Sequence, residues 1–292
     1  MPADFRILVA TDGSPAARAA LGAAVRFPWP NPSRARAVVA LGALSPRGAS
    51  AALRAALVRA LHVHADEARE ALRSRWSDAD AVALHEAPVD AVLSEKRRFS
   101  AGAIVLGWRG HGTFRRLLAG SVSRSLVARV DCPALVVRTA PKTVRRFVVG
   151  FDDCPNARRA VQFLGGMAPP RGNLVVLVNV LEPLLQPATL RLPRASAALI
   201  RSEIARLDRQ RYEQAMAKTD AAAARLRKRG WRVQVALRAG APLDVLLDSA
   251  QQRKADIIAV GARATRGLGR ALLGSVAAGV LDRSPVPVLV VP

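Results

Sequence analysis

The sequence has few aromatic residues, two cysteines and no long apolar run, and each shortage excludes a class of protein. Aromatic residues make up 4% of the 292 positions, and the four tryptophans are scattered, so they form no stripe of rings on which nucleic-acid bases could stack. Two cysteines cannot build a disulfide framework, and with four scattered histidines no metal-ligand spacing is present. No apolar run approaches the roughly 18–20 residues of a membrane span. We therefore expect neither a membrane protein nor a metal site.

The N-terminus also lacks the features of a secretory signal. Met1-Pro-Ala-Asp leads directly into a strand-like Phe5–Val9, without the basic segment and the longer apolar segment of a signal peptide. The sequence therefore predicts a cytoplasmic protein.

Acidic side chains are scarce relative to basic ones. The chain has 45 lysines and arginines against 22 aspartates and glutamates, a formal net charge of +23. Such a charge indicates either an acidic partner, such as nucleic acid, or an arginine-rich composition spread over solvated helix faces. The second explanation is favoured because no block of five or six like charges occurs. No helix-turn-helix, zinc or RNA-binding signature accompanies the charge, so a nucleic-acid partner is not expected.

What the sequence does contain is a repeated glycine pattern. Gly107-Trp-Arg-Gly110 is followed, after nine residues, by Gly120-Ser121, and 154 positions later Gly261-Ala-Arg-Ala264 is followed at the same distance by Gly274-Ser275. Each pattern lies between an apolar run and a segment with helical spacing. A strand end, a glycine-rich loop and a helix start together offer backbone N–H groups to an anion. A tight turn would explain one such loop, but its recurrence favours an anion site.

The repeat extends over most of the chain. With an offset of 154, residues 88–137 match residues 242–291 without a gap, and with an offset of 140 Ile7–Pro15 matches Phe147–Pro155. About 14 residues are therefore inserted in the second copy. A period of this length indicates two homologous domains rather than a solenoid. We predict domains at 1–140 and 145–292, joined by a short linker.

Strands and helices are predicted to alternate in both copies. The predicted strands are Phe5–Ala10, Ala37–Leu44, Ala81–His85, Ala103–Leu106, Ala134–Val137, Phe147–Phe151, Leu174–Leu181, Arg232–Leu237, Ile257–Val260 and Val286–Val291. The predicted helices are Pro15–Arg26, Ser50–Trp76, Val89–Arg98, Ser121–Arg129, Asn156–Leu164, Ala195–Arg229, Leu243–Arg253 and Ser275–Asp282. Apolar strands that alternate with helices predict an α/β fold, a parallel sheet covered on both faces. Ligands of such doubly wound sheets bind beyond the carboxyl ends of the strands, where the winding reverses.

The combined pattern resembles the universal stress proteins, in a tandem form. Nucleotide-binding members of that family carry an Asp after the first strand and G-x2-G-x9-G-[ST] after the fourth, which Asp12 and the segment Gly107–Ser121 match. The resemblance implies two adenine nucleotide alpha hydrolase-like domains, each a five-stranded parallel sheet of order 3-2-1-4-5. It also implies that the two domains of the chain pair through their last strands. It leaves open whether two such tandem chains associate as a homodimer. The ligand that the resemblance implies is ATP or another adenine nucleotide, with or without Mg²⁺. The role that it implies is in a stress response.

The resemblance also assigns roles in the first domain. Asp12 would face the ribose or adenine, Leu106 and Gly107 would line the base and sugar, and Arg109 would add charge against the phosphates. An alternative role for Asp12 is a helix N-cap, although capping by Ser14 would leave its carboxylate free. The complete set of expected nucleotide-binding residues is Asp12, Ala43, Leu106, Gly107, Arg109, Gly110, Gly120, Ser121, Val122 and Ser123.

The second domain departs from the family pattern. Ala264 replaces the second glycine, Ala277 stands where the first domain has Ser123, and Asp153-Cys154 replaces Gly13-Ser14. A methyl group at 264 disfavours a backbone with positive φ, and the loss of a hydroxyl at 277 removes one phosphate contact. We therefore expect a weaker second site, or none, with the first domain as the main one. The residues expected at the second site are Asp152, Val180, Gly261, Arg263, Gly274, Ser275 and Val276.

Other residues near the predicted loops allow two interpretations each. Arg115, Arg116, Arg124 and His111 form either a basic rim or a solvated face. Cys154 precedes a helix, where the dipole would lower its thiol pKa, so it is either a redox-sensitive thiol or a small packed residue. His62 and His64 lie on a long helix and are expected to be ordinary surface or boundary residues.

These observations favour a regulatory module that binds an adenine nucleotide. An enzyme, such as a slow ATPase, is disfavoured because the G-x4-G-K-[ST] loop and an evident base for activating water are both missing, so we predict no catalytic residue. The remaining alternatives are a scaffold that has lost nucleotide binding and a basic protein that binds a polyanion.

Overall fold

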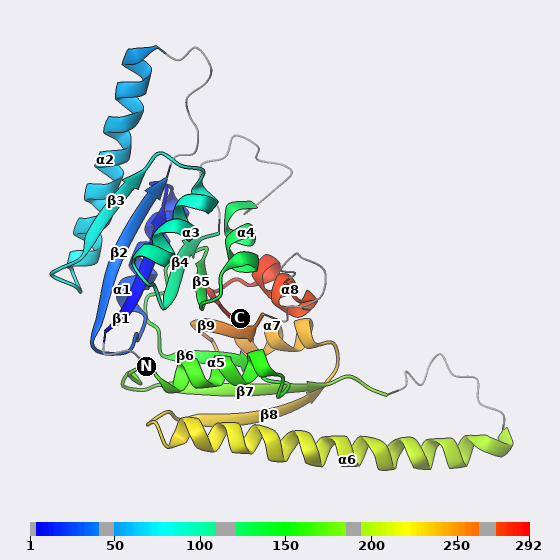
Figure 1. Ribbon diagram of the computed structural model, residues 1–292. Helices are drawn as coiled ribbons and strands as arrows, with labels where there is room; N and C mark the ends of the chain where they lie inside the picture. The colour runs from blue at the N-terminus through cyan, green and yellow to red at the C-terminus, as the bar shows by residue number, and fades with distance from the viewer. Residues whose placement is uncertain (1–3, 41–49, 109–120, 185–193, 263–272) are drawn as a thin grey trace.

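The computed structural model describes residues 4–40, 50–108, 121–184, 194–262 and 273–292 (Figure 1). The elements of the first copy are β1 (Phe5–Thr11), α1 (Pro15–Arg26), β2 (Ser33–Ala40), α2 (Ala51–Arg73), β3 (Asp80–Leu84), α3 (Pro88–Arg98), β4 (Ala103–Gly107), α4 (Ser121–Arg129) and β5 (Ala134–Val137). Those of the second are β6 (Arg146–Gly150), α5 (Pro155–Gly165), β7 (Leu174–Leu181), α6 (Arg194–Arg227), β8 (Val233–Ala239), α7 (Pro242–Gln252), β9 (Ile257–Gly261), α8 (Ser275–Arg283) and β10 (Val288–Val291).

All of these strands join one sheet, in the order β3-β2-β1-β4-β5-β10-β9-β6-β7-β8. Every strand pair within a copy is parallel, so each copy has the predicted order 3-2-1-4-5. The copies meet where β5 and β10 pair antiparallel, with Leu135 opposite Leu289. The α/β fold and the pairing through the last strands are thereby confirmed.

The helices form two layers, one on each face of this sheet. Because side chains alternate along a strand, Ile7 and Val9 enter one layer of core and Leu8 enters the other. Helices α1, α2, α5 and α6 pack on the first face, and helices α3, α4, α7 and α8 pack on the second. Each core layer includes residues of both copies, so the two domains share their hydrophobic interior.

Six aromatic rings join the two copies on the first face, and we call them the aromatic bridge. Phe27 of the first copy lies edge-on to Phe147 of the second, with ring centroids 6.1 Å apart, and Phe147 lies edge-on to Trp231 at 5.4 Å. Phe5 contacts Phe163 of the second copy at 6.0 Å. The bridge consists of Phe5, Phe27, Trp29, Phe147, Phe163 and Trp231. It places half of the few aromatic residues between the domains.

The second face carries polar contacts between the copies. Arg138, just after β5, donates hydrogen bonds to the carbonyl oxygens of Leu281 and Asp282 at 2.5 and 2.6 Å. These carbonyls belong to the last turn of α8, where a cation is favoured by the helix dipole. Arg124 of α4 forms an ion pair with the Asp282 carboxylate. Arg124, interpreted from sequence as a rim or solvated residue, therefore contributes to the domain interface.

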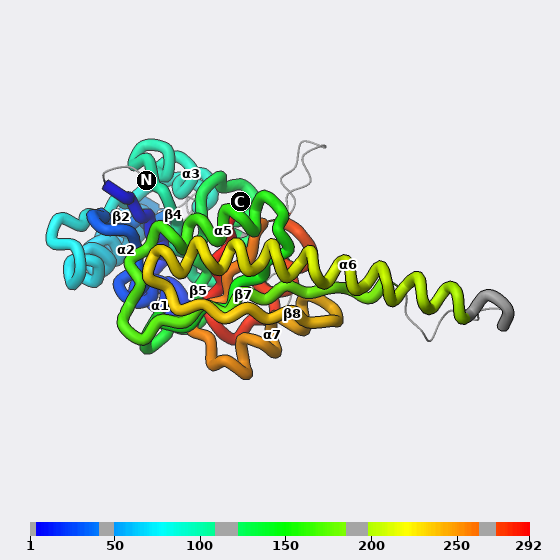
Figure 2. The backbone as a smooth tube through the Cα atoms, turned by 90° about the horizontal axis from the view of Figure 1, so that it is seen from below, coloured from blue at the N-terminus to red at the C-terminus, as the bar shows by residue number. Residues whose placement is uncertain are grey.

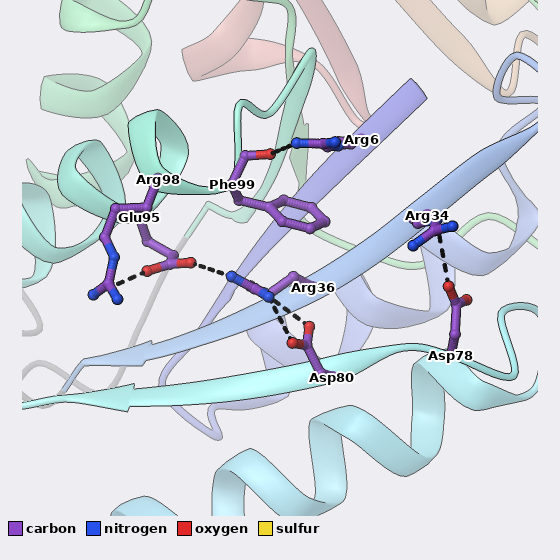
Figure 3. A network of polar contacts seen from close by, with 8 residues as sticks. All are labelled: Arg6, Arg34, Arg36, Asp78, Asp80, Glu95, Arg98 and Phe99. Atoms are coloured by element: carbon purple, nitrogen blue, oxygen red, sulfur yellow. Dashed lines mark hydrogen bonds and ion pairs between the residues drawn. The ribbon is translucent and has the colours of Figure 1, made fainter. Parts of the chain in front are cut away.

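A polar network lies where β2, β3 and α3 of the first copy meet (Figure 3). Arg36 of β2 holds the Asp80 carboxylate with two hydrogen bonds of 2.8 and 2.7 Å and donates a third, of 2.8 Å, to Glu95. Its guanidinium also lies 4.5 Å from the centroid of the Phe99 ring. Glu95 is 1% exposed, so the network buries a carboxylate that is compensated by one arginine on β2 and, at 3.9 Å, by Arg98. The hydrogen bonds to Asp80 and, to a smaller extent, to Glu95 raise the pKa of Arg36.

Two predicted elements differ from the structure. The second strand was predicted at Ala37–Leu44, but it begins at Ser33, which pairs with Phe5 of β1. The segment Ser33-Arg-Ala-Arg36 does not resemble a buried strand because it contains two arginines. In the structure both arginines form ion pairs. Residues 41–44 lie outside the described part of the chain. In α2, the buried residues begin only at Leu61, and Leu53 is 45% exposed, because the first turns of the helix run beyond the sheet (Figure 1).

Helix α6 also projects beyond the sheet, as Figure 2 shows. It has 34 residues, about 51 Å at 1.5 Å per residue, and only its second half contributes buried residues such as Ala222 and Leu226. Leu199 in the projecting half is 73% exposed. Helix α6 itself holds most of the insertion that lengthens the second copy, because it has 34 residues where its counterpart α2 has 23.

Candidate functional site

The predicted site of the first copy lies at the carboxyl ends of β1 and β4, where the winding of the sheet reverses. These two strands are neighbours, with Ala10 of β1 opposite Leu106 of β4. Asp12 follows the end of β1, and Gly107 ends β4. The structure therefore brings together two residues that are 95 positions apart, at the edge where a ligand of a doubly wound sheet is expected.

Asp12 is part of a tight turn between β1 and α1. Its Oδ1 accepts a hydrogen bond of 3.0 Å from the Ser14 backbone N–H. The Ser14 hydroxyl in turn accepts one of 3.1 Å from the Ala17 N–H and so caps α1, as predicted. The expectation that this cap leaves the Asp12 carboxylate free was wrong, because the aspartate holds the turn. Asp12 remains half-buried, and Gly13 beside it has a φ of +74°, which favours glycine.

Arg18 of α1 contacts this turn, a role that the sequence did not predict. Its guanidinium donates a hydrogen bond of 2.5 Å to the Gly13 carbonyl oxygen. Arg158 occupies the matching position in the second copy, at the offset of 140, and it also contacts the residue that matches Gly13. The recurrence of arginine at this offset was the signal that could have identified it.

Leu106 and Gly107 have roles in packing. The Leu106 side chain is 1% exposed and belongs to the core, so only its backbone lies at the edge of the sheet. A Cβ on Gly107 would lie 2.7 Å from the carbonyl carbon of Ala16 and 2.9 Å from the Ala17 nitrogen. Gly261 has the same constraint, since its Cβ would lie 2.8 Å from the Ala157 nitrogen. The first glycine of each motif thus lets the first turn of α1 or α5 approach the neighbouring strand.

We expect Gly107→Ala to lower the free energy of unfolding by about 1–3 kcal/mol, the usual range for overpacking. Its matched control is Gly165→Ala in α5, where the nearest atom to the added Cβ is 3.7 Å away, and we expect a gain of up to about 1 kcal/mol. Urea denaturation followed by circular dichroism measures both. A Gly107→Ala protein as stable as the wild type would show that the close approach to α1 is dispensable.

The start of α4 supplies the other described residues of the predicted site. Ser121 begins the helix, and Val122 is 39% exposed. Ser123 is 7% exposed, and its hydroxyl donates a hydrogen bond of 2.5 Å to the Gly107 carbonyl oxygen, which ties α4 to β4. This hydroxyl proton was expected to contact a phosphate, and the structure gives it an internal acceptor instead. Expected site residues outside the described part of the chain are Ala43, Arg109, Gly110 and Gly120; the rim residues Arg115, Arg116 and His111 are outside it too.

The corresponding edge of the second copy carries one more carboxylate, which is ion-paired. Asp152 accepts a hydrogen bond of 3.1 Å from the Cys154 N–H, which repeats the turn of Asp12. Asp153 matches Gly13 and has a φ of 61°. Arg158 binds its carboxylate through two contacts of 2.7 Å, and Lys218 of α6 lies 3.4 Å away. Arg158 and then Lys218 lower the pKa of Asp153, so the carboxylate is held as an anion at the entrance of this edge.

The remaining residues expected at the second site differ in exposure. Gly261 ends β9 and Val180 lies on β7, and both are half-buried. Gly274 is the N-cap of α8 and offers no side-chain cap, Ser275 is exposed and Val276 is half-buried. Ala277, at the position of Ser123, is 2% exposed, so the hydroxyl tie to the preceding strand is replaced by an apolar contact. Arg263 lies outside the described residues.

Cys154 does not have the properties of an activated thiol. Its Sγ accepts a hydrogen bond from the Ala157 N–H at 3.4 Å and so caps α5 as Ser14 caps α1. Burial, followed by the neighbouring Asp152, raises its pKa, whereas the dipole argument from sequence predicted a lowered one. The prediction failed because burial of the thiol, and then the Asp152 carboxylate, disfavour the thiolate more than the helix dipole favours it. Burial raises the pKa of Cys132 to about 12.

Several expectations about other ligands can be compared with the described residues. All four tryptophans are buried, at most 6% exposed, so they provide no ring for stacking bases. Among the residues that the structure describes, no group of three or more His, Cys, Asp or Glu side chains is placed to hold a metal ion. Within the same ranges, none of the helices has the length and apolar character needed to cross a membrane.

Comparison with known proteins identifies similar sequences and folds. The model of the universal stress protein family matches residues 5–138 and again 143–292. Universal stress protein Rv1996 of Mycobacterium tuberculosis is 29% identical over 198 residues, which cover 64% of this chain and 57% of that protein. Stress response protein NhaX of Bacillus subtilis is 36% identical over 72 residues, 25% of this chain and 43% of NhaX. The chain thus matches only about half the length of these curated relatives.

Solved structures extend the similarity over the whole chain. A universal stress protein from Archaeoglobus fulgidus DSM 4304 superposes with a TM-score of 0.68 at 18% identity, covering 98% of this chain and 97% of the other. The functionally unknown protein PA1789 from Pseudomonas aeruginosa PAO1 superposes with a TM-score of 0.60, also at 18% identity, covering 98% and 92%. At these identities the likeness concerns the fold, including the arrangement of two copies in one chain.

Proposed function

The chain belongs to the universal stress protein family, as a tandem of two family domains, and from this premise we propose that it binds ATP or a related adenine nucleotide in its first domain. The proposal assigns the protein to the cytoplasm as a regulatory module of a stress response. One observation carries it above the others: the turn of Asp12 and the end of β4 converge with the start of α4 at the reversal point of the sheet. The N-terminus of a helix at such an edge favours the negative charge of phosphates.

The residue types expected at this edge match the chemical groups of an adenine nucleotide. Asp12 supplies carboxylate oxygens that accept hydrogen bonds from ribose hydroxyls or the adenine amine. Gly120, Ser121 and Val122 would hold the phosphates through backbone N–H groups, with Gly110 allowing close approach and Arg109 adding charge. Mg²⁺, if it accompanies the nucleotide, would be held mainly by the phosphates, since the described residues gather no carboxylate cluster there.

The second domain is the weaker candidate because of Asp153. Its carboxylate occupies the position where the first domain has a glycine, and a nucleotide at the same edge would have to fit beside a side chain that is ion-paired with Arg158 and Lys218. Ala277 in place of Ser123 removes a hydroxyl from the helix start. We propose that the second domain serves chiefly as the pairing partner of the first, through β10 and the aromatic bridge.

Calorimetric titration with Mg-ATP tests the proposal. We expect one site per chain with a dissociation constant in the micromolar range, equivalent to about −8 kcal/mol. Asp12→Asn keeps an oxygen that accepts from Ser14 and removes the charge, so it should weaken binding about tenfold or more, as loss of a charged hydrogen bond does. The matched variant Asp152→Asn should bind like the wild type.

Two further outcomes decide between the alternatives. Gly120→Val should abolish binding, whereas Gly274→Val at the matching position should preserve it. The absence both of heat and of nucleotide in the purified protein would contradict the proposal and favour a scaffold, for which the shared core and the β5–β10 pairing already provide the structure. Steady release of phosphate would instead reveal an enzyme.

A further inference from the structure

His64 of α2 lies against the turn that contains Asp12. A Cβ built on Gly13 would lie 2.4 Å from the Cε1 atom of the His64 ring and 2.6 Å from each of its two nitrogens. The imidazole therefore fills the space that a side chain at position 13 would occupy. Gly13 is the residue directly after Asp12, so the ring lies beside the expected ribose and adenine end of the site. The sequence interpretation had treated this histidine as an ordinary surface or boundary residue.

The surroundings of the ring orient it. Nδ1 lies 3.2 Å from the Glu67 carboxylate, one turn later on α2, which favours the tautomer with its proton on Nδ1. Nε2 is then the acceptor nitrogen of the neutral ring. The side chain is 30% exposed, so the ring is supported by Gly13 and Glu67 and is still reached by solvent. A planar group held in this way, with an acceptor nitrogen at its edge, suits a hydroxyl or amine donor of a nucleoside.

The second domain shows what occupies this space when a glycine is absent. There the long helix α6 contributes Lys218, which lies 3.4 Å from Asp153. In both copies, a residue of the long helix (α2 or α6) thus contacts the residue that follows the aspartate at the end of the first strand. In the second copy Lys218 is ion-paired with the side chain at this position, whereas in the first the imidazole lies against a glycine, which has no side chain to pair with. His64 is therefore not tied to residue 13 in the way that Lys218 is tied to Asp153.

We infer that His64 contacts the nucleoside part of the nucleotide bound beside Asp12 and helps to determine its specificity, an inference that rests on the proposed function. The contact is a hydrogen bond to Nε2 from a ribose hydroxyl or from the adenine amine. The phosphates lie at the start of α4 and do not depend on this residue.

Titrations of the intact chain with Mg-ATP, adenosine and inorganic tripolyphosphate test the inference. His64→Ala should weaken ATP and adenosine binding about tenfold, the upper range for loss of one neutral hydrogen bond, and leave tripolyphosphate binding unchanged. His64→Gln, which retains an amide near the position of Nε2, should stay within about threefold of the wild type. His62→Ala, an exposed histidine on the same helix, is the matched control and should have no effect. In NMR spectra the ring signals of His64, and not those of His62, should shift as adenosine is added.

The outcomes separate this inference from the proposed function. If the wild type binds ATP and His64→Ala binds it equally well, or if the His64 ring signals do not move, the inference is overturned while the proposed function stands. Equal losses for all three ligands would show a structural role and overturn it as well. A wild-type chain that binds no adenine nucleotide would overturn both.

Discussion

Replacing Arg36 with methionine is expected to lower the free energy of unfolding by about 3 kcal/mol, because it leaves a buried carboxylate without its close partner. Glu95 is 1% exposed, and Arg36 is the cation that contacts it at 2.8 Å. Arg98, the other cation near Glu95, is 3.9 Å away and 74% exposed, so water screens its charge. Methionine preserves most of the volume of the arginine stem, so the loss reports mainly on the charge. Urea denaturation followed by circular dichroism measures the difference.

The same strand provides a matched control. Arg34 lies two residues earlier on β2, contacts Asp4 at 2.8 Å and Asp78 at 3.5 Å, and is 61% exposed (Figure 3). Arg34→Met should therefore lower the free energy of unfolding by less than about 1 kcal/mol, as loss of a surface ion pair does. Equal effects of the two substitutions would show that burial of Glu95 is not what makes the network important.

A double variant tests the explanation further. In the second copy Val176 and Ser249 occupy the positions of Arg36 and Glu95, so the fold tolerates an uncharged pair there. Arg36→Met combined with Glu95→Leu removes both charges, and apolar replacement of a buried ion pair is often neutral or stabilising. We expect the double variant to be more stable than Arg36→Met alone. A double variant less stable than the single one would contradict the proposed cause.

Replacing Phe147 with alanine is expected to lower the free energy of unfolding by about 3–5 kcal/mol, the range for truncating a buried aromatic side chain. The Phe147 ring is 1% exposed and lies between Phe27 of the first copy and Trp231 of the second. The cavity would open at the junction of the two domains. Denaturation followed by both tryptophan fluorescence and circular dichroism should also show whether the domains still unfold together.

Two controls accompany this substitution. Phe147→Leu retains most of the apolar volume and should lose less than half as much stability. Tyr212→Ala on the exposed side of α6 removes an aromatic ring that is 47% exposed, and it should change the free energy of unfolding by less than about 0.5 kcal/mol. A loss below about 1 kcal/mol for Phe147→Ala would mean that the aromatic bridge contributes little to the association of the domains.

Most of the fold could be predicted from local patterns. Apolar runs and helical spacing identified every strand and helix that the structure describes, and Pro15–Arg26 was predicted with both ends correct. Proline at the first helical position after a capping serine explains that success, because the signal is contained in adjacent residues. The start of β2 was missed because Arg34 and Arg36 are polar residues whose ion-pair partners come from other parts of the chain.

The candidate site could be proposed from the sequence, but the contacts of its residues could not. The glycine motifs and the strand-end aspartates predict a site at one edge of the sheet, and the structure brings Asp12 and Gly107 together at that edge. The structure gives three residues roles that the sequence did not indicate. Asp12 holds a turn, Gly107 permits the approach of α1, and the Ser123 hydroxyl donates a hydrogen bond to the Gly107 carbonyl oxygen. The pKa of Cys154 is raised because burial and Asp152 outweigh the helix dipole.

The sequence by itself determined the two copies and their alternating elements, and it predicted an edge for ligand binding, because repeats, periodicity and glycine spacing are properties of residues close together in the chain. Only the tertiary structure decided which distant side chains meet. Arg36 and Glu95 are 59 positions apart, Phe27 and Phe147 are 120 apart, and His64 reaches Gly13 from a helix whose packing no local pattern specifies. Such contacts depend on how helices lie on the sheet, and that arrangement is set by the packing of the whole core.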